Sequence, residues 1–260
     1  MPMKSIRDAE IAGLRVLMRC DFNVPLDETG RVCDDFRIQE TLPTIEYILK
    51  KKGKLVLMTH IGDPEGKVVQ RLRVDGIQKK LAELLDVPVA QAPDCVGKKA
   101  EALSFTMAPG DILLLENLRF HKEEQENSRS FAKQLASLGD MYVNDAFSVC
   151  HRAHASTIGV PALLPSFAGL FLEHELAGLE RLLKNPKRPV VAIIGGKKID
   201  SKLPVIDAIS ETADAVLLGN LLANAAKRKK IRFQNPSKIL FPLDALPGKG
   251  KEFDIGPKTK

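Results

Sequence analysis

Short apolar runs alternate with segments of helical periodicity along most of this chain, and this alternation restricts the possible fold more than any other feature. Residues 54–58 are typical of a buried strand, whereas residues 38–51 carry apolar side chains at the spacing of one helix face. Strand and helix repeated in this order predict a parallel sheet covered by helices on both faces. The expected strands are 14–18, 54–58, 87–89, 112–115 and 141–143, and the expected helices are 38–51, 74–85, 96–105 and 128–138.

A second, smaller α/β unit is predicted after the proline-rich break at residues 185–189. An amphipathic helix at 173–183 precedes this break. We therefore expect a doubly wound, Rossmann-like N-terminal domain at 1–172, a linker helix or hinge at 173–188 and a reduced α/β unit at 189–260. The expected elements of the second unit are strands 190–194, 215–218 and 239–241, a helix ending near 210 and a helix at 221–228.

Composition limits the classes of protein to which the chain can belong. Its 260 residues are 44% hydrophobic, which is enough for a core, and its net charge of +6 would suit an anionic partner. The basic run 227–230 is typical of a solvated face, and no nucleic-acid-binding motif accompanies it. No apolar run is long enough to cross a membrane, and no signal peptide opens the chain, so we expect a cytoplasmic protein.

The four cysteines are scattered and show none of the spacings of a zinc motif. We expect reduced thiols and no metal held by the protein itself. Cys150 stands beside His151, which would suit an activated nucleophile, but neighbours in sequence rarely have that geometry, and a structural thiol is the preferred interpretation.

Polar side chains gather just past the ends of the predicted strands. Because carboxyl ends of parallel strands meet at one edge of a sheet, these side chains should share one crevice. Guanidinium groups converging there would repel one another unless an anion intervened, and they are natural partners of phosphate and carboxylate. Any one arginine alone would more often form a surface ion pair, and a lone histidine would more often be structural. The residues are Asp21, Asn23, Arg37 in the following loop, His60, Asn117, Arg119, Asp145, His151 and Arg152.

A second candidate site lies between a strand and a helix of the smaller unit. Gly195 and Gly196 form a turn there, and Lys198 and Lys202 follow one helical turn apart. Backbone N–H groups, a helix N-terminus and two ammonium groups could hold phosphates. The pattern matches neither common phosphate-binding motif, and a plain tight turn with solvated lysines would explain it equally well.

With these residues assembled, the chain resembles the phosphoglycerate kinase family. The resemblance extends from Arg15 to Lys202 with few gaps, and shorter matching strings occur over residues 253–259. The strings that carry it are Arg19-Cys20-Asp21-Phe22-Asn23-Val24-Pro25, Asp34-Asp35-Phe36-Arg37-Ile38, Leu114-Leu115-Glu116-Asn117-Leu118-Arg119-Phe120-His121 and Asn144-Asp145-Ala146-Phe147 through His151-Arg152-Ala153-His154.

The resemblance implies reversible phosphoryl transfer between 1,3-bisphosphoglycerate and ADP, giving 3-phosphoglycerate and ATP. The substrates would be a phosphoglycerate and Mg-ATP or Mg-ADP, with magnesium carried by the nucleotide. Asp21 and Asn23 would hold the glycerate region, and His60, Arg119 and Arg152 the phosphate. Arg37 and Lys198 would be catalytic. The implied substrate-binding residues also include Phe22, Arg37, Ile61, Gly62 and Asp63, and the implied nucleotide-binding residues are Gly195, Gly196, Lys198 and Lys202.

The chain departs from the family pattern at three points. Asp63 stands where the family has a phosphate-facing arginine, which should weaken substrate binding, and Lys197 replaces a small residue beside the nucleotide. Later nucleotide-binding motifs have no counterpart. We expect either a monomer or a chain completed by a second one that supplies the missing half-domain; the alternative function is a relative that only binds phosphorylated anions.

Overall fold

The computed structural model describes residues 4–184, 186–196, 198–243, 245–247 and 253–255. The chain divides into two compact units, Met1–Ala177 and Gly178–Lys260. This division falls inside the long helix α6 (Leu170–Lys184), so each unit includes part of that helix. The domain boundaries at 172 and 188 stay predictions.

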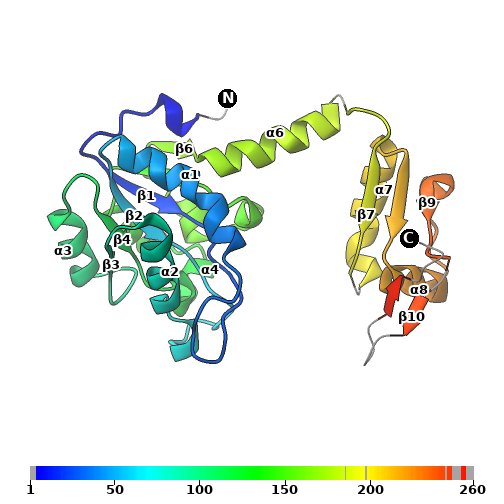
Figure 1. The fold of residues 1–260 in the computed structure, drawn as a ribbon, viewed down its shortest axis with the longest axis horizontal. Helices are drawn as coiled ribbons and strands as arrows, with labels where there is room; N and C mark the ends of the chain where they lie inside the picture. The colour runs from blue at the N-terminus through cyan, green and yellow to red at the C-terminus, as the bar shows by residue number, and fades with distance from the viewer. Residues whose placement is uncertain (1–3, 185, 197, 244, 248–252, 256–260) are drawn as a thin grey trace. The chain divides into compact units, whose positions relative to one another are not determined.

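A parallel sheet of six strands forms the centre of the first unit (Figure 1). All its pairings are parallel, which confirms the predicted fold class. Its order is β3-β4-β2-β1-β5-β6. The strands are β1 (Arg15–Arg19), β2 (Lys54–Met58), β3 (Val89–Gln91), β4 (Ile112–Leu114), β5 (Met141–Asn144) and β6 (Ser166–Ala168).

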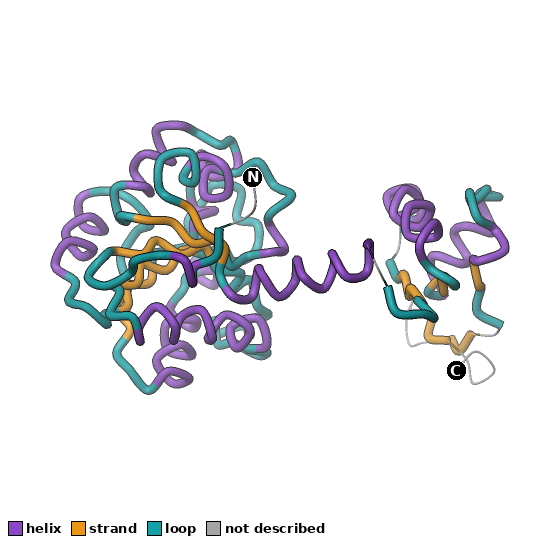
Figure 2. The backbone as a smooth tube through the Cα atoms, turned by 90° about the horizontal axis from the view of Figure 1, so that it is seen from above, coloured by secondary structure: helices purple, strands orange, loops and turns teal. Residues whose placement is uncertain are grey.

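Helices cover both faces of this sheet, as Figure 2 shows. Successive strand residues point to opposite faces, so Val16 and Met18 of β1 pack in one apolar cluster and Leu17 in the other. The first cluster includes residues of α1 (Phe36–Lys50) and α2 (Asp75–Leu85), and the second includes residues of α3 (Lys98–Thr106) and α5 (Arg129–Ala136). The remaining short helices of the first unit are Ile6–Asp8, Gln70–Leu72, Leu118–Phe120, α4 (Lys122–Gln125), Phe147–Val149 and a π-helical turn at Ala155–Gly159; the short helix Pro236–Lys238 lies in the second unit.

The strand order reverses direction between β1 and β5. Chain progression leads from β1 to β2 on one side, whereas β5 and β6 extend the sheet on the other side. In open α/β sheets, ligands bind beyond the carboxyl ends of the strands at such a reversal. The topology therefore points to the residues that follow β1 and β5.

Several predicted elements of the first unit differ in their bounds or were missed, and β3, α1 and β6 are the most informative of them. Strand β3 begins two residues later than expected, at Val89, because Pro88 has no N–H to donate to the ladder. Helix α1 begins earlier, at Phe36, where Asp34 Oδ1 accepts from the Phe36 N–H at 2.9 Å. Arg37 therefore lies in the first helical turn and not in the loop. Strand β6 was missed because it is short and flanked by loop-forming proline and glycine.

The second unit contains a parallel sheet in the order β7-β8-β9 and an antiparallel pair, β10 with β11. One apolar cluster joins this parallel sheet to α7 and α8. The other face of β7 is open to solvent, with Ile193 79% exposed. The elements are β7 (Val191–Ile194), α7 (Ile199–Thr212), β8 (Ala215–Leu218), α8 (Asn220–Lys229), β9 (Ile239–Leu240), β10 (Ala245–Pro247) and β11 (Phe253–Ile255).

Candidate functional site

His60 follows β2 and is buried, with 4% of its surface exposed. Its Nδ1 lies 3.0 Å from Nη2 of Arg19, the last residue of β1. A guanidinium can only donate, so Nδ1 accepts and the proton of the neutral ring resides on Nε2. Burial lowers the pKa of His60 to about 2, and the positive charges of Arg19 and Arg119 contribute. The ring is therefore a neutral hydrogen-bond donor at physiological pH.

Arg19 is itself held by a buried polar network. Its Nε donates to Ser156 Oγ at 3.0 Å, and the backbone N–H of Ser156 donates to Glu124 Oε2 at 2.9 Å. His154 Nδ1 lies 3.9 Å from the other oxygen of Glu124. The prediction of site residues missed Arg19, Glu124 and His154. A charged residue at the end of an apolar strand, such as Arg19, is the one signal that could have revealed this network.

Asn117 and Arg119 follow β4 and fasten the loop that carries His60. Asn117 Oδ1 accepts from the N–H groups of Ile61 (3.2 Å) and Arg119 (3.1 Å). Its Nδ2 donates to the carbonyl of Ile61 at 2.9 Å. Arg119 Nη1 donates to the carbonyl of Gly62 at 2.7 Å. These bonds fix the distance between the ends of β2 and β4.

Asp21 and Arg37 lie at the reversal of strand order. Arg37 Nη1 donates to Asp21 Oδ2 at 2.7 Å, and Ser148, which follows β5, donates to the same oxygen at 2.6 Å. Asp21 is largely buried, whereas the Arg37 side chain is 49% exposed. The three side chains line a cavity of about 460 Å³. Arg37 is therefore oriented by the carboxylate while its guanidinium remains accessible.

Charges link the predicted arginines to His60. The positive charge of Arg37 lowers the pKa of His60, as that of Arg119 does. Burial lowers the pKa of Arg119, and Arg19 and Arg152 lower it further. Arg152 is exposed, and in the described part of the chain no hydrogen bond or ion pair reaches its guanidinium. Arg37 and Arg119 therefore act electrostatically on His60, and Arg152 acts on Arg119.

The substituted residue Asp63 lies beside Arg119. Its Oδ1 lies 3.9 Å from Arg119 Nη1, and Gln125 Nε2 donates to the same oxygen at 3.3 Å. The Asp63 side chain is 65% exposed. It therefore partly offsets the charge of Arg119 through solvent-screened attraction.

The other predicted substrate-binding residues differ in what they can offer a ligand. Phe22 and Ile61 are buried in the core, so only their backbone groups could face a ligand. Asn23 Oδ1 accepts from the Gly62 N–H at 2.8 Å. Gly62 itself has a left-handed φ of +62°, which favours glycine. His151 is exposed beside Arg152.

The predicted phosphate-binding turn of the second unit connects β7 to α7. Gly196 has a φ of +135°, and Lys202 Cε lies 3.6 Å from where a β-carbon at Gly196 would be. Lys198 precedes the first residue of α7. The backbone of this turn is therefore open to close approach by a ligand, with Lys202 alongside. Lys197 lies outside the described residues.

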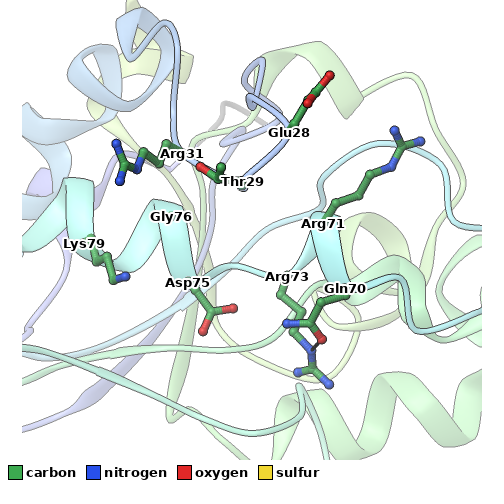
Figure 3. Close-up of a pocket in the computed structure, with 10 residues that line it drawn as sticks. Glu28, Thr29, Arg31, Gln70, Arg71, Arg73, Asp75, Gly76 and Lys79 are labelled. Carbon is green, nitrogen blue, oxygen red and sulfur yellow. Dashed lines mark hydrogen bonds between the residues drawn. The ribbon is translucent and has the colours of Figure 1, made fainter.

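A larger hollow of about 540 Å³ lies beside the start of α2. Figure 3 shows the carboxylates of Glu28 and Asp75 among its cationic side chains. Arg73, one of these cations, is already paired with Glu116 at 2.7 Å. The residues that line this hollow lie at positions 28–31 and 70–79 and not at the carboxyl ends of the strands, so the strand ends form the better candidate site.

Comparisons with known proteins identify the family of the chain. The sequence profile of the phosphoglycerate kinase family matches residues 6–231. The chain belongs to the phosphoglycerate kinase family. The phosphoglycerate kinase of Pelotomaculum thermopropionicum is 48% identical over 224 residues, which cover 86% of this chain and 57% of that relative. The phosphoglycerate kinase of Chlorobium phaeobacteroides (strain BS1) is 41% identical over an alignment that covers the whole chain and 76% of the relative.

Solved phosphoglycerate kinases share the fold. The structure from Pyrococcus horikoshii OT3 matches with a TM-score of 0.86 and 27% identity, covering 97% of this chain and 70% of that one. The structure from Coxiella burnetii matches with a TM-score of 0.75 and 33% identity, covering 88% and 57%. The chain thus spans a little over half the length of several relatives. In the part of the chain that the structure describes, no helix is long and apolar enough to cross a bilayer.

Proposed function

We propose that this chain catalyses reversible phosphoryl transfer between 1,3-bisphosphoglycerate and ADP, giving 3-phosphoglycerate and ATP. The observation that carries the proposal is the neutral, buried His60 within the electrostatic reach of Arg19, Arg37 and Arg119 at the carboxyl ends of a parallel sheet. An anion bound between several guanidinium groups reduces their mutual repulsion, so such a cluster favours an anionic ligand.

In this proposal the first unit binds the phosphoglycerate. His60 donates through Nε2–H to the phosphate, and Arg119 and Arg152 supply its positive charge. Asp21 and Asn23 hold the hydroxyl and carboxylate region. Arg37, accessible and oriented by Asp21, stabilises the phosphoryl group during transfer. Such a reaction needs alignment and positive charge and no covalent nucleophile on the protein.

The second unit binds Mg-ADP or Mg-ATP in the same proposal. The turn at Gly195 and Gly196 presents backbone groups to the phosphates, Lys202 binds them, and Lys198 meets the transferred group. The absence of side chains at both glycines supports this assignment, because a phosphate can approach the backbone closely there. Magnesium enters with the nucleotide and neutralises phosphate charge.

A coupled assay with 3-phosphoglycerate, ATP and magnesium tests the proposal. We expect turnover by the parent chain and a fall in kcat of about 10²- to 10³-fold for Arg37→Ala, the size typical of losing one group that stabilises a transition state. The exposed Arg129→Ala at the start of α5 is the matched control and should keep parental activity. Binding of 3-phosphoglycerate without any turnover at high enzyme concentration would instead indicate a protein that only binds the anion.

A further inference from the structure

A thiol, an imidazole and a carboxylate from two separate loops lie together, and none of the three is assigned to the substrate. Asp94 and Cys95 lie between β3 and α3, and His121 lies between the turn Leu118–Phe120 and α4. The potential ligand atoms of these three residues all lie within 4.8 Å of one another. Zinc-motif spacing could not reveal the group, because 25 positions of sequence separate Cys95 from His121.

Neighbouring contacts hold the three side chains in place. His121 Nε2 lies 2.7 Å from Asp94 Oδ1, and the same oxygen accepts from the Cys95 N–H at 2.7 Å. The imidazole packs against Phe131 with ring centroids 5.2 Å apart. The three side chains are thus held in position without an ion, so that binding an ion costs less conformational entropy.

We propose that Asp94, Cys95 and His121 form a binding site for a thiophilic divalent cation of the Zn²⁺ class. Thiolate sulfur, imidazole nitrogen and carboxylate oxygen are the ligand types that Zn²⁺ takes, and three protein ligands leave a fourth position for water. Metal–ligand distances of about 2.0 to 2.3 Å in a tetrahedron place ligand atoms about 3.3 to 3.8 Å apart. The cluster therefore reaches this geometry with side-chain shifts of about 1 Å.

Exposure provides a path for the ion. Cys95 is fully buried, whereas the side chains of Asp94 and His121 are 49% and 27% exposed. The ion enters from the side of these two residues, and water occupies the open position. Binding displaces the Cys95 thiol proton to solvent and forms the metal–sulfur bond with the resulting thiolate. The hydrogen that His121 Nε2 donates to Asp94 moves to Nδ1 of the neutral ring, which leaves the Nε2 lone pair for the ion.

A bound ion would cross-link the loop before α3 to the segment that contains Arg119, which stands two residues before His121. Metal binding itself does not depend on the proposed kinase activity. It can be measured on the full chain with no phosphoglycerate or nucleotide present.

Titration of the full chain with Co²⁺ tests the site, because thiolate-bound Co²⁺ has a near-ultraviolet charge-transfer band and four-coordinate Co²⁺ has intense visible bands. We expect both in the parent chain and their reversal by added Zn²⁺. Cys95→Ser should abolish the charge-transfer band, and His121→Gln should weaken Co²⁺ affinity by at least about tenfold. Cys33→Ser, which removes an exposed thiol outside the cluster, is the control and should leave the titration unchanged.

Absence of the charge-transfer band in the parent, or its persistence in Cys95→Ser, would overturn the site. Should Cys95→Ser fail to fold, the more exposed His121→Gln decides, with its fold checked by circular dichroism. Parental Co²⁺ affinity in a folded His121→Gln would then refute the assignment.

Discussion

At the scale of single residues, the protonation state of His60 is the most specific consequence of the structure. Burial and nearby arginines lower its pKa to about 2, and Arg19 fixes its Nδ1 as the acceptor. We predict that ¹⁵N NMR of the imidazole shows the neutral Nε2–H form throughout pH 5 to 8. A titration midpoint for His60 near the ordinary value of about 6.5 would show that the ring is not held as described.

The charge of Asp63 should limit affinity for the substrate. Its carboxylate lies 3.9 Å from Arg119 Nη1 and is mostly exposed, so a bound phosphate would experience a repulsion of about 1 kcal/mol in a water-like dielectric. We predict that Asp63→Asn binds 3-phosphoglycerate about fivefold more tightly in calorimetry, and that Asp63→Arg gains more. Asp86→Asn, which changes an exposed carboxylate at the end of α2, should have no effect. Unchanged affinity in both Asp63 variants would mean that position 63 does not sense the ligand.

At the scale of elements, the start of α6 depends on residues distant in sequence. Asp145 Oδ1 accepts from the N–H groups of Phe171 (3.0 Å) and Leu172 (3.1 Å), and Thr44 Oγ1 accepts from that of Leu170 (2.9 Å). Burial nevertheless raises the pKa of Asp145 to about 6, although the hydrogen bonds from the Phe171 and Leu172 N–H groups act in the opposite direction.

This raised pKa predicts the sign of a pH effect. The native state binds a proton at Asp145 below about pH 6, whereas the unfolded chain does so only near 3.8, so this group adds stability as pH falls through that window. Through this group, the free energy of unfolding should increase by about 2 kcal/mol as the pH falls from 7.5 to 4.5. In urea titrations at these two pH values, Asp145→Asn should lack that increment relative to the parent chain. An identical pH dependence in both proteins would contradict the assignment.

These long-range caps explain why element bounds were harder to predict than element types. Periodicity was sufficient for the helices and for the longer strands of the sheet, because each repeats its apolar spacing several times. The start of α6 at Leu170, three residues before the predicted one, depends on Thr44 and Asp145. Such partners carry no local signal in the sequence.

The solvent-exposed face of the β7–β8–β9 sheet gives a second prediction at this scale. Ile193, Leu217 and Leu240 pair across the three strands, so they share one face. Parallel sheets are normally covered on both faces. We predict that Ile193→Lys lowers binding of a hydrophobic dye and leaves the free energy of unfolding within about 0.5 kcal/mol of the parent value. The buried Ile206→Lys is the contrast and should unfold this unit; strong destabilisation by Ile193→Lys would show that another element covers the face.

At the scale of the whole molecule, the positions of the site residues followed from the rule that parallel strands end at one edge. That rule was enough for Asp21, His60 and Arg119, which each follow a strand. It could not reveal the buried Arg19 and Glu124 network or the meeting of Cys95 with His121, because these contacts depend on how loops fold back over the sheet. Strand order was also needed to locate the reversal where Asp21 meets Ser148.

The central claim is that the strand ends of the first unit bind a phosphorylated three-carbon acid, and calorimetric titration of the full chain with 3-phosphoglycerate tests it most directly. We predict saturable binding at one site and a loss of about tenfold to a hundredfold in affinity for Arg119→Ala, with Arg129→Ala unchanged. Parental affinity in an Arg119→Ala protein whose circular dichroism shows it folded, or no binding by the parent chain, would contradict the account.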